Sequence, residues 1–138
     1  MSFLKLLGPD NEHPGSATLL RGQTRVAELV KEVQQSPYWA ESVVIVTYDE
    51  NGGRWDHVPP PPGDRWGPGT RVPTIIISPY AKKRYVDHTQ YDTTSILKFI
   101  EQRWHLAPLG DRDAGANGMS DCFDFTREKL PAPQRGGD

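Results

Sequence analysis

The chain has 138 residues, 36% hydrophobic and 25% charged, a composition that is ordinary for a globular protein and excludes fibrous and disordered classes. Its net charge of −2 gives no footprint for nucleic acid, and the short basic cluster Lys82-Lys83-Arg84 indicates a solvated turn, so neither DNA nor RNA is an expected partner. Apolar runs of about six residues fall far short of the roughly 20 that cross a bilayer, so no transmembrane segment is expected.

The N-terminal stretch MSFLKLLGPDNEHPG has too short an apolar run for a secretory signal peptide, and its residues 2–6 suit a short strand. Residues 24–35 follow, with Val26, Leu29, Val30 and Val33 at the spacing of an amphipathic helix. The sequence therefore predicts a helix that buries one apolar face.

Two strands are predicted at residues 42–47 and 72–78. Each has a continuous apolar run without a polar face, a pattern typical of strands that are covered on both sides in a parallel sheet. The proline- and glycine-rich stretch between Asp49 and Thr70 predicts a long irregular loop, and loops of that length in compact domains are usually functional.

A second amphipathic helix is predicted from an N-cap at Asp92 or Thr93 through Trp104. Beyond it, residues 108–138 are rich in Gly, Asp, Pro and Ala, and predict a tail that runs over the surface with Phe123 and Phe125 as its apolar anchors. We assign residues 1–127 to one catalytic-domain portion and residues 128–138 to a flexible tail.

Asp49 and Glu50 are the first candidates for chemistry, because they end a buried strand and divalent cations accept carboxylate oxygens. Neighbouring side chains on a regular strand point to opposite faces, so both acids reach one ion only if the backbone leaves strand geometry, which the following Asn51-Gly52 permits. The alternative is a tight Asn-Gly turn preceded by two solvated acids.

Asp56 and His57 form a second candidate pair, with the histidine as a base or ligand beside a carboxylate; the alternative is an exposed polar pair in a loop. His13, which precedes Pro14, alone suits a surface turn. Zinc-ligand spacings, phosphate-cradling glycine loops and nucleophile elbows are absent from the sequence.

Three stretches together, TYDENGGRWDHVPPPP, GTRVPTIIISPYAKK and YDTTSILKFIEQRW, resemble the C-terminal part of the bacterial phosphoesterase family of acid phosphatases and phospholipases C. The flanks SFLKLLGPDNEHPG and LAPLGDRDAGANGMSDCFDF look closest to the acid phosphatase branch. The resemblance implies an alkaline-phosphatase-like αβα sandwich and hydrolysis of phosphate esters beside a divalent metal ion.

By the same resemblance, Asp49 and Glu50 are metal ligands, His13 contacts the substrate phosphate, and Asp56 and His57 support the site. The family's hydroxyl nucleophile and first metal ligands have no counterpart in this chain, so we expect the isolated chain to be inactive or very weakly active. Relatives in the phospholipase branch tend to carry histidine where this chain has Thr93, which turns the expected substrate away from lipid. Family members are often periplasmic or secreted.

The prediction is thus an α/β chain, a partial αβα sandwich with buried, mainly parallel strands, that carries part of a metal-dependent phosphoric ester hydrolase. Two helices and two firm strands are few for an independent sheet. The sequence therefore also allows a non-catalytic module that pairs through an exposed sheet edge, either as a homo-oligomer or with a missing N-terminal portion.

Overall fold

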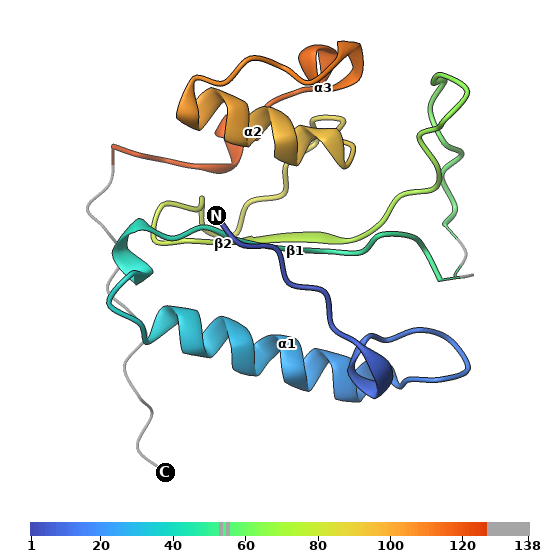
Figure 1. The fold of residues 1–138 in the computed structure, drawn as a ribbon, viewed down its shortest axis with the longest axis vertical. Coiled ribbons are helices and arrows are strands. Elements are labelled where there is room, and N and C mark those ends of the chain that lie inside the picture. Colours follow the sequence, from blue (N-terminus) through green and yellow to red (C-terminus); the bar gives the residue numbers. More distant parts are fainter. Residues whose placement is uncertain (53, 55, 127–138) are drawn as a thin grey trace. The chain divides into compact units, whose positions relative to one another are not determined.

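The computed structural model of the chain describes residues 1–52, 54 and 56–126, which form two compact units, residues 1–79 and residues 80–126. Figure 1 traces both units. The tail assigned to residues 128–138 lies outside the described residues.

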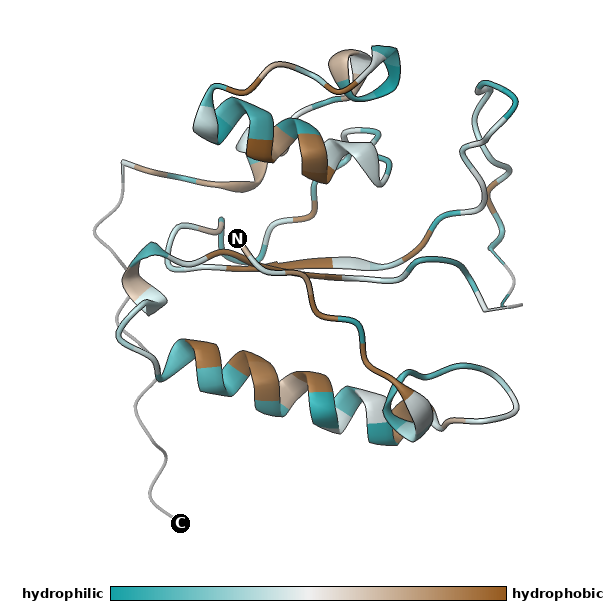
Figure 2. Ribbon diagram, in the orientation of Figure 1, coloured by the Kyte–Doolittle hydropathy of each residue, from teal (hydrophilic) through white to brown (hydrophobic). Residues whose placement is uncertain are grey.

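The first unit contains two single-turn 3-10 helices, one long α-helix and two strands. In chain order they are η1 (Gly8–Asp10), α1 (Leu19–Gln34), η2 (Trp39–Glu41), β1 (Val44–Thr47) and β2 (Thr74–Ile77). The predicted first helix is confirmed but begins earlier, because Thr18 caps it by accepting a hydrogen bond from the Arg21 N–H at 3.3 Å. Apolar and polar residues alternate along α1 in Figure 2, as in an amphipathic helix.

Both predicted strands are present, but the expectation of parallel pairing is wrong for them. β1 and β2 pair antiparallel, with Val44 opposite Ile77 and Thr47 opposite Thr74. A parallel pair needs a crossover, usually a helix, whereas the described residues between these two strands include no helix. Helix and small sheet together confirm a mixed α/β-type unit.

The strands are also less covered than their sequence suggests. Residues 44–47 are half-buried and Ile75 is exposed, so the predicted burial on both faces is wrong for this unit. Residues 2–6, predicted as a short strand, have no regular secondary structure. An apolar run therefore marked the strands correctly without indicating how many layers cover them.

The second unit is helical, with α2 (Thr94–Trp104), α3 (Asp111–Gly115) and η3 (Ser120–Cys122). The predicted second helix is confirmed and ends at His105, whose left-handed backbone (φ 54°) lets its N–H bond to the Glu101 carbonyl. The chain beyond residue 108 is not wholly a surface tail, since Phe123 is buried and stacks on Phe99 with ring centroids 5.2 Å apart. Phe123 is thus confirmed as an anchor.

Among the described residues, no helix is both long and apolar enough to span a membrane.

Candidate functional site

The first unit contains a cleft of about 600 Å³ at the end of the strand pair. Its charged and phenolic lining comprises Glu12, Tyr48, Glu50, Arg54, Asp56 and Arg71. Most of these residues belong to the loop that joins β1 to β2, and Glu12 comes from the segment before α1. The predicted long loop therefore supplies most of the ionisable side chains that line this cleft.

Asp49 and Glu50 follow β1 directly and face different surroundings. Among the residues described, Glu50 lines the cleft and Asp49 does not. The Asp49 carboxylate instead accepts a hydrogen bond from the Lys5 ammonium at 3.0 Å. This hydrogen bond and the positive charge of Lys5 lower the pKa of Asp49. Both acids are exposed, so Asp49 would have to leave Lys5 before the two carboxylates could share one cation.

The turn predicted at Asn51-Gly52 forms. The Arg54 N–H donates to the Asn51 carbonyl at 3.0 Å, and Gly52 adopts φ +60°. It is a local turn rather than a two-residue hairpin, because β2 begins only at Thr74. The backbone after Asp49 and Glu50 thus does leave strand geometry, as a shared metal site would require.

Glycine at position 52 also allows two distant motifs to approach each other. A Cβ on Gly52 would lie 3.3 Å from the Pro14 Cγ, so the turn packs closely against the segment that carries His13. The Tyr48 hydroxyl donates to the Glu12 carboxylate on the other side of His13. Both neighbours of His13 therefore contact the 48–52 segment, which brings the predicted phosphate contact into the vicinity of the predicted metal ligands.

The Nδ1 atom of His13 is engaged by the backbone of the next residue. Nδ1 lies 2.8 Å from the Pro14 carbonyl oxygen, which only accepts, so Nδ1 carries a proton. Nε2 can then donate to a phosphate oxygen only when the ring is the imidazolium cation. The role predicted for His13 accordingly requires a protonated ring.

Asp56 is engaged by Arg71 from the far end of the same loop. Its two oxygens accept from the Arg71 side chain at 2.9 and 3.0 Å, and one of them also accepts from the Arg71 backbone N–H at 3.2 Å. These hydrogen bonds hold the pKa of Asp56 well below its usual range. Asp56, whose side chain is only 14% exposed, therefore closes the base of the loop, while the adjacent His57 is exposed.

Glu12 and Gly22 were not singled out from the sequence. Glu12 lies over α1 so closely that a Cβ on Gly22 would come 2.1 Å from its Cγ, and its backbone has φ +61°. Its hydrogen bond with Tyr48 raises the pKa of that phenol. A glycine inside a good helix was the available signal, since such residues usually mark close packing.

A divalent cation finds only part of a coordination shell in the described residues. They contain no group of three or more His, Cys, Asp or Glu side chains arranged to hold a metal ion. Glu50 and, after release from Lys5, Asp49 supply the hard oxygen ligands that such cations prefer. The donor chemistry fits, and further ligands would have to come from elsewhere.

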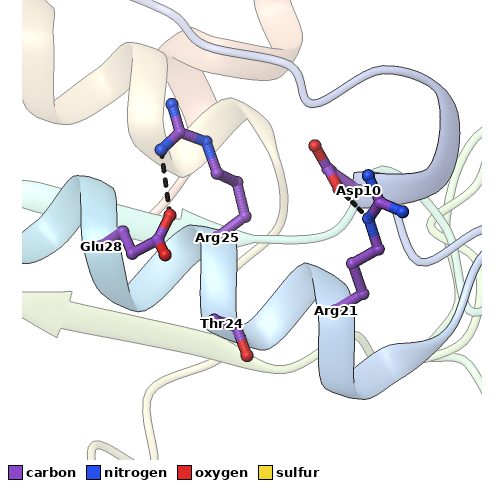
Figure 3. A pocket seen from close by; sticks show the side chains of 5 residues that line it. All are labelled: Asp10, Arg21, Thr24, Arg25 and Glu28. Atoms are coloured by element: carbon purple, nitrogen blue, oxygen red, sulfur yellow. Dashed lines mark hydrogen bonds and ion pairs between the residues drawn. The ribbon is translucent and has the colours of Figure 1, made fainter.

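A second hollow, of about 360 Å³, lies along α1 and carries no comparable chemistry. Figure 3 shows its lining, in which Arg21 pairs with Asp10 at 2.5 Å and Arg25 pairs with Glu28 at 3.1 Å. Because both guanidinium groups already have carboxylate partners, neither offers a vacant charge to a ligand.

The chain belongs to the Phosphoesterase family, whose model matches residues 1–107, a range that includes His13, Asp49 and Glu50. Non-specific phospholipase C5 of Arabidopsis thaliana is 35% identical over 154 residues, which cover 94% of this chain and 30% of that protein. Non-specific phospholipase C6 of the same plant is 33% identical, covering 86% and 28%. Phospholipase C B of Mycobacterium tuberculosis (strain ATCC 25618 / H37Rv) is 30% identical, covering 88% and 29%.

The chain thus spans less than a third of the length of these relatives. The family predicted from the motifs is confirmed. All three of these relatives carry phospholipase names, whereas the acid phosphatase branch stays a prediction.

Proposed function

We propose that this chain carries part of the site of a metal-dependent phosphoric ester hydrolase, with Asp49 and Glu50 as ligands of a divalent cation. The observation that carries the proposal is the cleft itself, which Glu50 lines together with Glu12, the residue before His13, in a chain of the Phosphoesterase family. Bound there, a divalent cation would supply Lewis-acid stabilisation of phosphoryl oxygens. The parent fold that we propose is the alkaline-phosphatase-like sandwich.

In this proposal each residue has a defined task. Protonated His13 donates from Nε2 to the substrate phosphate. Asp56 and Arg71 fix the loop that presents Glu50, and His57 supports the same loop from its exposed position. The hydroxyl nucleophile and the remaining metal ligands are left to residues outside this chain, so the isolated chain should bind metal weakly and turn over slowly or not at all.

The phosphate ester that we infer is a phospholipid. The named relatives are phospholipases C, and this outweighs the single position, Thr93, that pointed away from lipid. A soluble phosphate monoester, as in the acid phosphatase branch, is the competing substrate. Parallel assays with a chromogenic monoester and a chromogenic choline phosphodiester separate the two.

The test combines turnover with metal binding across magnesium, calcium, manganese and zinc. Asp49→Asn and Glu50→Gln each remove a proposed ligand charge, and Glu41→Gln removes an exposed acid outside the cleft as the matched control. A ligand that binds the folded state raises the melting temperature by mass action. We expect a metal-induced rise in the wild type and in Glu41→Gln that is lost in both ligand variants.

Lys5→Met provides a further test. The substitution frees the Asp49 carboxylate and should therefore increase the rise in melting temperature that metal causes. Metal-dependent turnover that disappears in Asp49→Asn would show that the chain assembles a working site. Equal metal effects in the wild type, Asp49→Asn and Glu50→Gln would refute the assignment of both ligands.

A second candidate function, an assembly module, is favoured by the sheet. Within the described residues, β1 and β2 each have one hydrogen-bonded strand partner, so one edge of each strand is unpaired, and Ile75 is exposed. Light scattering during size-exclusion chromatography distinguishes the outcomes, since a monomer at micromolar concentration would contradict self-association through these edges.

A further inference from the structure

The loop between β1 and β2 ends in a closed tip, residues 64–67, which the proposed site does not use. Asp64 and Gly67 form an antiparallel bridge in which the Gly67 N–H donates to the Asp64 carbonyl at 3.2 Å. The Asp64 carboxylate also accepts from the Trp66 N–H at 2.8 Å. A Cβ on Gly63 would come 1.9 Å from the Gly67 carbonyl oxygen, so the two sides of the tip meet at van der Waals contact only because position 63 is glycine. The tip therefore has a defined shape.

This closed tip presents a large aromatic ring to solvent. Trp66 is 72% exposed, and the guanidinium carbon of Arg65 lies 4.3 Å from the centroid of its ring. The stacking holds a cation against an indole at the end of a stem stiffened by consecutive prolines, residues 59–62. Because the Trp66 ring is exposed where it stands, its burial against a partner would be a net gain in apolar contact.

We propose that the 64–67 tip is a membrane-contact element, which places Trp66 in the headgroup region of a phospholipid surface and Arg65 against lipid phosphates. Indole rings concentrate at membrane–water interfaces because one edge is apolar and the other carries a polar N–H. Guanidinium groups bind phosphate oxygens in a planar, charge-assisted geometry. The pair Arg65–Trp66 thus offers the two chemistries that a phospholipid headgroup region accepts together.

The size of the tip favours a lipid surface over a protein. A stable protein interface covers about 800 Å² on each partner, far more than four residues present. One interfacial aromatic ring beside one cation, in contrast, adds usefully to the affinity for a membrane. The same loop also carries the cleft at its base, through Glu50 and Arg71, and Figure 1 shows it projecting beyond the ends of β1 and β2. A tip bound to lipid would hold that segment near a supply of headgroups.

The choice of lipid rests on the proposed function, but the test does not require turnover. The full chain is sedimented with phosphatidylcholine vesicles, alone and with phosphatidylglycerol. Trp66→Ala should lower the partition coefficient about tenfold, as expected when most of one large apolar side chain is no longer buried. Arg65→Gln should lower it to a smaller degree. The matched control is Trp104→Ala on α2, because Trp104 is 58% exposed and has Arg103 stacked 4.6 Å from its ring centroid.

A spectroscopic measurement checks that the ring itself enters the lipid. Tryptophan emission should shift to shorter wavelength on vesicle addition and be quenched by brominated acyl chains in the wild type and in Trp104→Ala, but not in Trp66→Phe. Equal partitioning of Trp66→Ala and wild type would overturn the proposal, as would equal losses in Trp66→Ala and Trp104→Ala. Competition by soluble glycerophosphocholine would overturn it too, because it would indicate a small-ligand site instead of a surface contact.

The proposed function and the proposed membrane contact are refuted by different results. Loss of the metal response in Asp49→Asn with unchanged vesicle binding would support both, while a metal response that survives in Asp49→Asn refutes only the ligand assignment. Melting curves of Trp66→Ala without vesicles should match the wild type, since an exposed side chain contributes little to stability.

Discussion

The contact between Glu12 and Gly22 makes the most direct prediction from the structure, for the substitution Gly22→Ala. Alanine in a helix interior is favoured over glycine by about 1 kcal/mol, so propensity alone predicts stabilisation. The new Cβ, however, would lie 2.1 Å from the Glu12 Cγ and 2.8 Å from its Cδ. Glu12 cannot swing away freely, because its backbone is in the left-handed region and its carboxylate is bonded to Tyr48.

Overpacking of this kind costs typically about 1–3 kcal/mol, and the immobility of Glu12 favours the upper end. Subtracting the propensity gain leaves a net destabilisation of about 2 kcal/mol. Urea denaturation of the full chain, followed by circular dichroism, measures it. Gly115→Ala is the control, since a Cβ there meets nothing within 4 Å, and its effect should stay within about 0.5 kcal/mol.

A double-mutant cycle isolates the contact from other effects of the substitution. Glu12→Ala removes the obstacle, so in that background Gly22→Ala should stabilise the chain by up to about 1 kcal/mol. The coupling free energy between the two positions would then be about 3 kcal/mol. If Gly22→Ala were neutral or stabilising in the wild-type background, the placement of Glu12 over α1 would be refuted.

Three further predictions concern stability. Phe123→Ala should cost about 3–5 kcal/mol by opening a cavity beneath Phe99, and Phe123→Leu clearly less; equal losses in urea denaturation would contradict the stacking. The neighbouring Asp113 carboxylate raises the pKa of Glu101, and burial raises it further. The folded state therefore favours the protonated form of Glu101, and the free energy of unfolding of the wild type should fall as pH rises above the unfolded pKa of about 4.3. Glu101→Gln should therefore melt higher than wild type at pH 8 and alike below about pH 4; a pH-independent difference would refute the charge explanation. Thr18→Ala should lower the free energy of unfolding by about 1 kcal/mol through loss of the α1 cap, whereas Thr18→Ser should retain most of it.

The regular elements could be predicted from the sequence because their signals are local. The spacing of apolar residues identified both long helices, and continuous apolar runs identified both strands. Strand direction could not be predicted in this way, since a continuous run looks the same in a parallel and an antiparallel pair. The connection carried the missing information: the stretch between Asp49 and Thr70 contains no helix-forming segment, which argues against a crossover.

For the candidate site, too, the sequence could predict what depends on local motifs but not the contacts between distant residues. Residue types with an obvious chemistry, such as Asp49 and Glu50, could be selected from a motif. The contacts of Glu12 with Tyr48 and α1 depend on residues that are 36 and 10 positions away, and no local pattern encodes such a separation. Lys5 is a similar case, because only the folded chain shows that a lysine 44 residues before Asp49 occupies its carboxylate.

Two cross-links at the base of the long loop explain how the proposed metal ligands could keep a fixed geometry on an irregular segment. The Asn51 amide donates to the Thr70 hydroxyl at 2.8 Å, and the Arg71 side chain donates two hydrogen bonds to the Asp56 carboxylate. Together they close the loop next to β1 and β2, so Glu50 lies in a short closed segment instead of a flexible one. Since misplacement by about 1 Å can cost a factor of 100 in rate, such closure would matter more for the proposed site than for the stability of the chain. Variants of Arg71 should accordingly affect the metal response of the cleft before they unfold the chain.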